Sequence, residues 1–251
     1  MCYSDRARPP LPPIRGAADD HGDIRLDSAD GTRLMAYEAR AAKPSGRGIV
    51  ILPDVRGLHR FYKELAVRFA EAGIDAVAID YFARTAEDDD RSESFDYKIH
   101  VPQTTPENIA LDVRAAVEQL RRSAGERVRA IFTVGFCFGG AMSWRQSGEG
   151  HGLAGAIGFY GGRPMTRAAP VIPNMEAPLL MLLAGVDSTP PEEFKEFADA
   201  VRRRGLQVEA HTYAGAPHSY FDRTCEEHKA ACEDSWRRML DFTQRLTPVP
   251  A

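Results

Sequence analysis

Short apolar runs alternate with segments of helical periodicity along most of the chain. Gly48–Pro53 is a continuous apolar run, as in strands buried on both faces of a parallel sheet. Tyr62–Ala72 follows with apolar residues at helical spacing and ends at Gly73. Because this alternation repeats toward the C-terminus, we predict an α/β fold with a mostly parallel central sheet and helices on both faces.

The remaining predicted elements continue the same order. The predicted strands are Ile74–Asp80, Val128–Val134, Leu153–Phe159, Leu179–Ala184 and Gln207–Tyr213. The predicted helices are Pro106–Ala124, which begins with a proline suited to a first turn, Phe138–Gln146, Pro191–Arg204 and about Cys225–Leu246. No repeat or clear linker separates them, so we predict a single domain over residues 22–251.

Three segments depart from this alternation. Residues 1–21 are rich in proline and charge, which predicts an extended N-terminal arm rather than a packed element. Asp23–Ser28 and Thr32–Ala39 alternate apolar and polar residues around a turn, which predicts an antiparallel hairpin. Residues 84–106 are polar and include the acidic run Glu87–Asp90. Irregular segments of such length are usually functional or mobile, although an acidic run by itself is typical of a solvated loop.

Composition narrows the classes of partner. The chain has 251 residues, of which 43% are hydrophobic and 27% are charged, which argues against disorder. A formal net charge of -4 gives no reason to expect a nucleic-acid partner. No apolar run approaches the length of a membrane span, and the N-terminus lacks a signal-like stretch, so we expect a soluble, cytoplasmic protein without a membrane partner. The oligomeric state stays open.

The four cysteines are too sparse for a disulfide scaffold and should be thiols in a reducing cytosol. Cys225 and Cys232 are two turns apart on the last predicted helix, with only His228 between them. A zinc site would need further ligands at recognisable spacing, so we predict no metal and interpret these cysteines as packing residues. No role is assigned to Cys2.

Cys137 occupies a different setting, because Gly135-Phe136-Cys137-Phe138-Gly139 falls where a strand ends and a helix begins. Glycines two residues before and after the central residue allow a sharp turn that projects its side chain above the sheet. Gly140 adds room for close packing. This pattern usually carries a serine nucleophile, and here it predicts a cysteine nucleophile. The alternative is a buried structural cysteine in a glycine-rich turn.

A thiol at this position needs a base. A helix N-terminus stabilises a thiolate by only about 0.3–1 kcal/mol, less than one pKa unit of about 1.36 kcal/mol. Asp187 ends a predicted strand, and His218 lies in a loop between the strand ending at Tyr213 and the last helix. Nucleophile, acid and histidine in this order resemble the α/β-hydrolase fold. We therefore predict that Cys137, Asp187 and His218 form a catalytic triad.

Several segments together resemble the dienelactone hydrolase family over roughly residues 22–246. They are Gly-Phe-Cys-Phe-Gly-Gly at 135–140, Gly-Val-Asp at 185–187, Pro-His-Ser-Tyr-Phe-Asp-Arg at 217–223, Leu-Pro-Asp-Val-Arg-Gly at 52–57 and Asp-Tyr-Phe-Ala-Arg at 80–84. The resemblance implies a hydrolase with little or no lid, a Cys–His–Asp triad and no cofactor. It also implies a small ester or lactone substrate, which in the family's type members carries a carboxylate.

The resemblance also implies roles for five further residues. The oxyanion hole would be formed by the backbone N–H groups of Val55 and Phe138. The glutamate that helps to deprotonate the cysteine corresponds to Asp54, which is one methylene shorter and could instead be a turn residue. The substrate-carboxylate arginines correspond to Arg84 and, with an offset of one residue, to Arg223. Either arginine could instead be a solvated surface residue.

Two other functions use the same residues. A thioesterase or acyltransferase would need the same triad with a larger acyl donor, and substrate profiling would distinguish it. A non-catalytic binding protein with this fold would leave Cys137 unreactive toward activated esters. We expect an ester or lactone hydrolase, because nucleophile, acid and histidine all occur at the expected positions.

Overall fold

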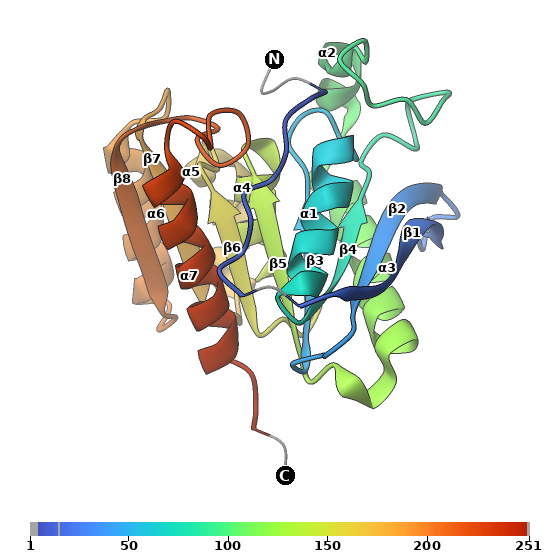
Figure 1. Ribbon diagram of the computed structural model, residues 1–251. Coiled ribbons are helices and arrows are strands. Elements are labelled where there is room, and N and C mark those ends of the chain that lie inside the picture. The colour runs from blue at the N-terminus through green and yellow to red at the C-terminus, as the bar shows by residue number, and fades with distance from the viewer. Residues whose placement is uncertain (1–4, 15, 250–251) are drawn as a thin grey trace.

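The computed structural model describes residues 5–14 and 16–249, and it contains one eight-stranded sheet (Figure 1). The strand order is β1-β2-β4-β3-β5-β6-β7-β8. The strands are β1 (Ala18–Asp27), β2 (Arg33–Ala41), β3 (Arg47–Leu52), β4 (Ile74–Ile79), β5 (Ala130–Phe136), β6 (Gly155–Phe159), β7 (Leu179–Val186) and β8 (Val208–Pro217). All neighbours from β4 to β8 are parallel, whereas β1 pairs with β2 and β2 with β4 in antiparallel fashion.

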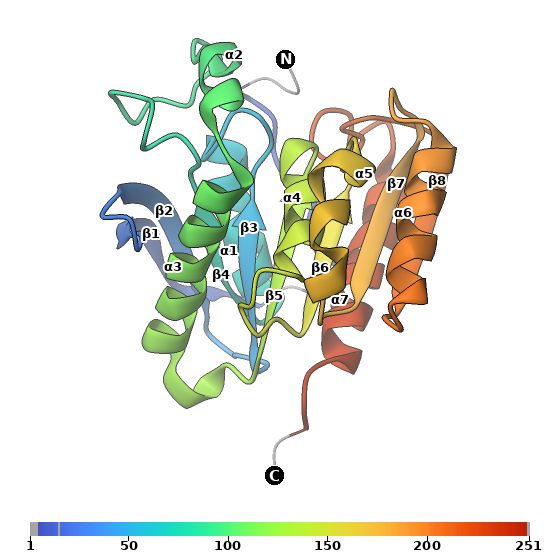
Figure 2. The ribbon, with the colours of Figure 1, turned by 180° about the vertical axis from the view of Figure 1, so that it is seen from behind.

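Helices cover both faces of this sheet (Figures 1 and 2). They are α1 (Arg60–Glu71), α2 (Tyr97–His100), α3 (Pro106–Ala124), α4 (Phe138–Gln146), α5 (Pro164–Arg167), α6 (Pro191–Arg203) and α7 (Lys229–Arg245). Short 3₁₀ helices lie at Val101–Gln103, Gly125–Arg127 and Ala169–Asn174. Helices α1 and α7 lie on one face, and α3, α4 and α6 lie on the other. The predicted mostly parallel sheet between two helical layers is confirmed.

Apolar side chains fill the space between the sheet and each helical layer. On the α1 and α7 face, Phe69 and Trp236 are fully buried and their ring centroids are 4.9 Å apart, which joins the two helices. On the other face, α3 contributes Ile109 and Val113, which are also fully buried. Because the central strands are covered on both sides, their sequences are continuous apolar runs.

Three element boundaries differ from the sequence prediction by four residues or more, one of them the end of β8, which lies at Pro217 rather than Tyr213. The hairpin begins at Ala18 rather than Asp23, because β1 continues its pairing with β2 back to Ala41. Helix α7 begins at Lys229 rather than Cys225. The preceding residues form turns, with the His228 N–H donating to the Thr224 carbonyl at 3.1 Å. Cys225 and Cys232 therefore do not share a helical face.

The N-terminal segment is irregular, as predicted, but it packs against the domain. Pro9 and Pro12 are buried, and Trp236 of α7 donates its indole N–H to the Pro10 carbonyl at 3.0 Å. Asp5 accepts a hydrogen bond from the buried Arg56 at 2.9 Å. The arm is therefore held along one face of the sheet. Cys2 lies outside the described residues.

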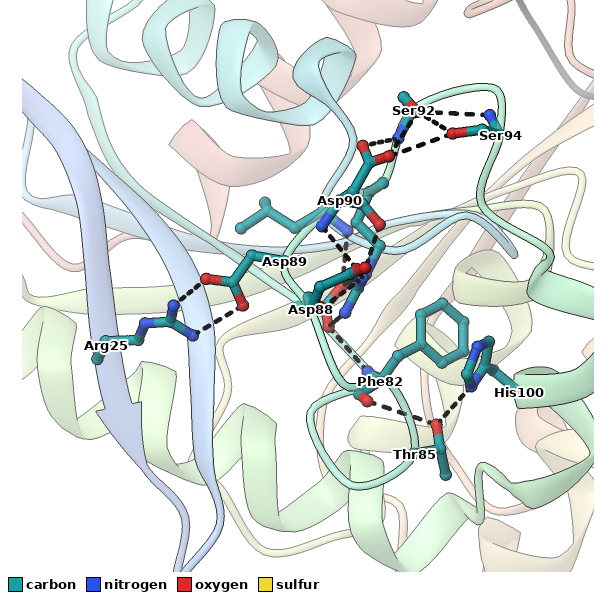
Figure 3. A network of polar contacts seen from close by, with 12 residues as sticks. Arg25, Phe82, Thr85, Asp88, Asp89, Asp90, Ser92, Ser94 and His100 are labelled. Atoms are coloured by element: carbon teal, nitrogen blue, oxygen red, sulfur yellow. Dashed lines mark hydrogen bonds and ion pairs between the residues drawn. The ribbon is translucent and has the colours of Figure 1, made fainter.

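The polar segment 84–106 is anchored to the sheet by tertiary contacts. Arg91 is buried and forms a two-pronged ion pair with Asp80 at the end of β4, with both N–O distances 3.0 Å. Figure 3 shows Asp89 of the acidic run turned toward Arg25 of β1, with which it pairs. The acidic run is thus partly tied to the hairpin rather than wholly solvated.

Among the described helices, none is long and apolar enough to cross a membrane.

Candidate active site

The turn between β5 and α4 brings Cys137 to the carboxyl edge of the sheet. Cys137 has φ 55° and ψ -113°, a conformation that costs free energy for any residue with a side chain. A Cβ atom on Gly135 would collide with the Gly139 carbonyl, and one on Gly140 would collide with the Phe159 carbonyl. The sequence places glycine at these positions because the backbones approach too closely for any side chain.

The start of α4 lies directly against the end of β3. A Cβ atom on Gly139 would meet the carbonyl oxygens at the end of β3. This close approach brings the loop that contains Val55 next to Phe138, the first residue of α4. The first N–H groups of a helix have no intrahelical acceptor, so Phe138 N–H is available for a developing negative charge. The arrangement is compatible with the predicted oxyanion hole.

His218 and Asp187 come together from the ends of the last two strands. His218 Nδ1 lies 2.7 Å from Asp187 Oδ2, and the Asp187 side chain is 3% exposed. The other carboxylate oxygen of Asp187 accepts a hydrogen bond from the Thr189 N–H at 3.1 Å. The backbone N–H of His218 donates to the Val186 carbonyl at 2.9 Å. Both the imidazole and the carboxylate are therefore held in fixed orientations.

Electrostatic interactions link His218 to both of its partners. Burial alone lowers the pKa of His218, but hydrogen bonds and negative charge from Asp187 and Cys137 outweigh it and raise the pKa to about 10. Burial raises the pKa of Asp187, and the hydrogen bond from His218 more than reverses this. The structure thus brings Cys137, His218 and Asp187 together, with a proton favoured on the imidazole.

An aromatic layer holds the His218 loop against the β5 turn. Tyr220 and Phe221, which follow His218, are fully buried. The Phe221 ring lies 5.6 Å from that of Phe136, next to Cys137, and the Tyr160 ring lies 4.9 Å from the His218 imidazole. The chain after His218 forms turns, and α7 begins only at Lys229.

Asp54 is fully buried near this cluster, together with Asp222, which the sequence analysis did not single out. Asp54 Oδ1 accepts a hydrogen bond from the Arg56 N–H at 2.9 Å. Asp222 is 1% exposed, and its carboxylate accepts from the Arg223 N–H at 2.7 Å. Burial and the negative charges of Asp54 and Cys137 raise the pKa of Asp222 well above its ordinary value. This shift favours the protonated form of the Asp222 carboxyl.

The predicted substrate-binding arginines are placed differently from each other. The Arg84 guanidinium forms a two-pronged ion pair with Asp112 of α3, with both distances 2.8 Å, and a further ion pair with Asp30 in the hairpin turn. The Arg223 side chain is exposed. A substrate role for Arg84 would require the substrate to compete with two carboxylates, and such a role for either arginine stays a prediction.

His59 and His100 have structural contacts of their own. His59 caps α1 by accepting from the Phe61 N–H at 3.1 Å, and its Nε2 lies 2.8 Å from Asp5. His100 stacks on Phe95 with ring centroids 4.9 Å apart. Its Nδ1 lies 3.0 Å from the Thr85 hydroxyl oxygen, and Figure 3 shows this contact as a dashed line.

Arg167 is a second residue that sequence reasoning missed. It is the last residue of the four-residue helix α5, and its guanidinium lies 5.1 Å from the centre of the Phe138 ring. The sequence between β6 and β7 shows no periodicity that predicts this helix. The only sequence signal is position, because the segment follows the strand next to β5 at the carboxyl edge of the sheet.

Cys225, Cys232 and the two cavities that border α7 offer no comparable chemistry. Burial raises the pKa of Cys225 and of Cys232 above the usual thiol range, which keeps both protonated. Cavities of about 740 Å³ and 490 Å³ border α7 and contain neither Cys137 nor His218. Within residues 5–14 and 16–249, no cluster of histidine, cysteine and carboxylate side chains could hold a metal ion.

Comparison with known proteins agrees with this fold. The chain is 28% identical over 264 residues to a carboxymethylenebutenolidase from Rhodococcus opacus, covering 99% of this chain and 98% of the relative. A dienelactone hydrolase-like promiscuous phosphotriesterase, P91, from metagenomic libraries superposes with a TM-score of 0.74 at 24% identity, covering 93% and 100% of the two chains. The Pyrococcus furiosus esterase Pf2001 gives a TM-score of 0.70 at 16% identity, covering 96% and 100%.

These likenesses confirm the predicted α/β-hydrolase fold, since dienelactone hydrolase-like proteins and esterases share this arrangement of sheet and helices. The model of the dienelactone hydrolase family matches residues 34–247, which is most of the chain. The chain therefore belongs to the dienelactone hydrolase family and is a hydrolase.

Proposed function

We propose that this protein hydrolyses a small ester or lactone through a thioester on Cys137, with His218 as proton carrier and Asp187 as its orienting carboxylate. The observation that carries the proposal is the 2.7 Å contact between His218 and Asp187, combined with the hydrogen bond and charge that link His218 to Cys137. The R. opacus relative, whose name denotes a butenolide-opening enzyme, supports a lactone as substrate.

The first half-reaction is transfer of the acyl group to sulfur. The Cys137 thiolate attacks the carbonyl carbon, and the N–H groups of Val55 and Phe138 stabilise the oxyanion. Collapse of this intermediate breaks the bond to the ester oxygen. The protonated His218 imidazole donates its proton to that oxygen, which leaves as a hydroxyl or enol group. For a lactone, the leaving group stays attached to the acyl chain.

The second half-reaction uses the same imidazole as a base. Once Cys137 is a thioester, its negative charge no longer raises the pKa of His218, and the imidazole has just lost its proton. His218 can then accept a proton from water while the resulting hydroxide attacks the thioester carbonyl. The thiolate leaves, the carboxylic acid product is released, and His218 is again protonated.

Intact-mass analysis after brief exposure to an activated ester tests the proposal. We expect one acyl adduct on the wild-type protein, its loss in Cys137→Ala, and its retention in the matched control Cys225→Ala. His218→Ala should lower turnover nearly as much as Cys137→Ala, because residues that act together are not additive.

Two results would refute the proposal. One is acylation that persists in Cys137→Ala, which would move the reactive thiol elsewhere. The other is near wild-type turnover of His218→Ala across neutral pH. Substrates are then compared as lactones, simple esters and thioesters, and a strong preference for thioesters would favour thioesterase or acyl-transfer activity with the same residues.

A further inference from the structure

The first described residues of the N-terminal arm lie at the carboxyl edge of the sheet, beside the loop between β3 and α1. Figure 1 shows the arm, in blue, running between α1 and α7 on one face of the sheet. Arg8 forms an ion pair with Glu64 of α1 at 3.2 Å, and the Pro10 carbonyl accepts a hydrogen bond from α7. These contacts fix the path of the arm and place Asp5 against the loop.

Asp5 joins this loop to the polar segment that follows β4. Its Oδ1 accepts hydrogen bonds from the Arg56 guanidinium at 2.9 Å and from His59 Nε2 at 2.8 Å. His59 Nδ1 accepts from the Phe61 N–H, so Nε2 carries the proton and is the donor to Asp5. Asp5 also exchanges hydrogen bonds with Glu93, whose carboxylate accepts from the Asp5 N–H at 2.6 Å and whose N–H donates to Asp5 Oδ2 at 3.3 Å. One carboxylate therefore connects two segments that follow neighbouring strands.

The loop that Asp5 holds carries one of the two proposed oxyanion donors. The Val55 N–H directly precedes Arg56, whose side chain is 2% exposed. On the other side of Val55, the Asp54 N–H donates to the Tyr62 hydroxyl at 3.0 Å, and Asp54 Oδ1 accepts from the Arg56 N–H at 2.9 Å. Within the described residues, no group accepts a hydrogen bond from the Val55 N–H. The direction of this N–H is therefore set by the residues on either side of it.

We propose that Asp5 is a positioning residue for the oxyanion hole, because it holds the Val55 N–H in place through the Arg56 side chain. The inference rests on the proposed function, since it takes Cys137 as the nucleophile and the Val55 N–H as an oxyanion donor. Asp5 acts through the loop rather than by contact with the substrate. A displacement of about 1 Å in a catalytic group can cost about 100-fold in rate, so a small movement of the loop is enough.

Two reactions of Cys137 separate this effect from a change in the thiol itself. Acylation by p-nitrophenyl acetate passes through a tetrahedral oxyanion and uses the hole. Alkylation by iodoacetamide is a displacement at a saturated carbon, in which no oxyanion forms. The ratio of the two second-order rate constants therefore reports on the oxyanion hole. The variants are Asp5→Ala, Asp5→Asn and the control Asp19→Ala, which removes an exposed carboxylate of β1.

We expect Asp5→Ala to lower the rate of acylation by about ten-fold. This is less than the loss of about 100-fold or more that removal of a whole oxyanion donor causes, because Asp54 and Tyr62 still hold the loop. Alkylation should stay within about two-fold of wild type, because it depends on the thiolate alone. Asp5→Asn, which keeps an acceptor oxygen but loses the charge, should lie between wild type and Asp5→Ala. Asp19→Ala should leave both rates unchanged.

An unchanged acylation rate in Asp5→Ala would overturn the inference. Equal falls in acylation and alkylation would also overturn it, because they would make Asp5 a structural residue without a specific effect on the oxyanion hole. The same fall of the ratio in Asp19→Ala would indicate a general effect of charge, with the same consequence. Failure of wild-type Cys137 to become acylated would contradict the proposed function itself, so the two failures are distinguishable. If Asp5→Ala does not fold, Asp5→Asn decides the matter, since a ratio equal to that of wild type would refute the inference.

Discussion

Replacing Arg84 should mainly lower the free energy of unfolding rather than change the choice of substrate. The Arg84 guanidinium is 15% exposed and holds Asp112, whose side chain is 1% exposed, through two hydrogen bonds of 2.8 Å. In Arg84→Ala, the Asp112 carboxylate stays buried, with a hydrogen bond from Ser28 as its remaining support. Removing one partner of a buried ion pair costs about 3–5 kcal/mol. Because Asp30 and part of Arg84 reach solvent, we expect the lower end, about 3 kcal/mol.

Urea unfolding of four proteins measures this effect: wild type, Arg84→Ala, Asp112→Asn and the double variant. The double variant should be more stable than Arg84→Ala, because the uncompensated carboxylate is gone. Burial raises the pKa of Asp112, and loss of Arg84 removes the opposing influence. The folded Arg84→Ala protein then binds a proton more tightly than the unfolded chain. The difference in unfolding free energy between wild type and Arg84→Ala should therefore shrink as the pH falls from about 7 to about 5.

A stability loss below about 1 kcal/mol with no pH dependence would refute this reasoning. If such an Arg84→Ala protein also lost activity only on acidic substrates, Arg84 would be a substrate-binding residue, as the sequence resemblance implied. Equal losses on acidic and neutral substrates would indicate a structural effect on the loop after β4.

Three further predictions use other parts of the molecule. Alkylation of Cys137 with iodoacetamide should lower the pKa of His218 from about 10, and an unchanged histidine titration by NMR would contradict the proposed coupling. Burial lowers the pKa of His151 to about 4, so the unfolded chain takes up a proton between that value and about 6.5. Stability should therefore fall by about 2 kcal/mol from pH ~7 to ~5, and a similar fall in His151→Gln would sink this explanation. Gly139→Ala should lose about 1–3 kcal/mol of unfolding free energy together with Cys137 reactivity, whereas Gly22→Ala, with open space around it, should lose neither.

Elements with their own local signals could be predicted from the sequence. Helix α3 has the predicted bounds because Thr105 caps it and Pro106 starts it. Helix α4 also has the predicted bounds, since the glycine-rich turn fixes its start. In contrast, α2 and α5 are four-residue helices held by tertiary contacts, and such short segments have no periodicity to read.

The same distinction applies to the site. Order along the chain was enough to single out Cys137, Asp187 and His218, because strand ends in a parallel sheet meet at one edge. The pKa values of Asp222 and Arg167 are shifted by burial and by neighbouring charges. The residues next to them in the sequence do not indicate this burial. Arg84 shows the converse, since a conspicuous arginine after a strand proved to be paired internally.

The central position of β3 has a consequence for the order of folding. β3 pairs with β4, its successor in sequence, and with β5, which follows only after α1, β4 and α3. During synthesis, one edge of the apolar strand Arg47–Leu52 therefore stays unpaired until Ala130–Phe136 has left the ribosome. Such an exposed edge can pair with other chains and cause aggregation. The turn at Cys137 between β5 and α4 lies against the end of β3, so it can form only after β5 has paired with β3. Conditions that slow the docking of β5 should therefore lower the yield of soluble protein more than the activity of the molecules that fold.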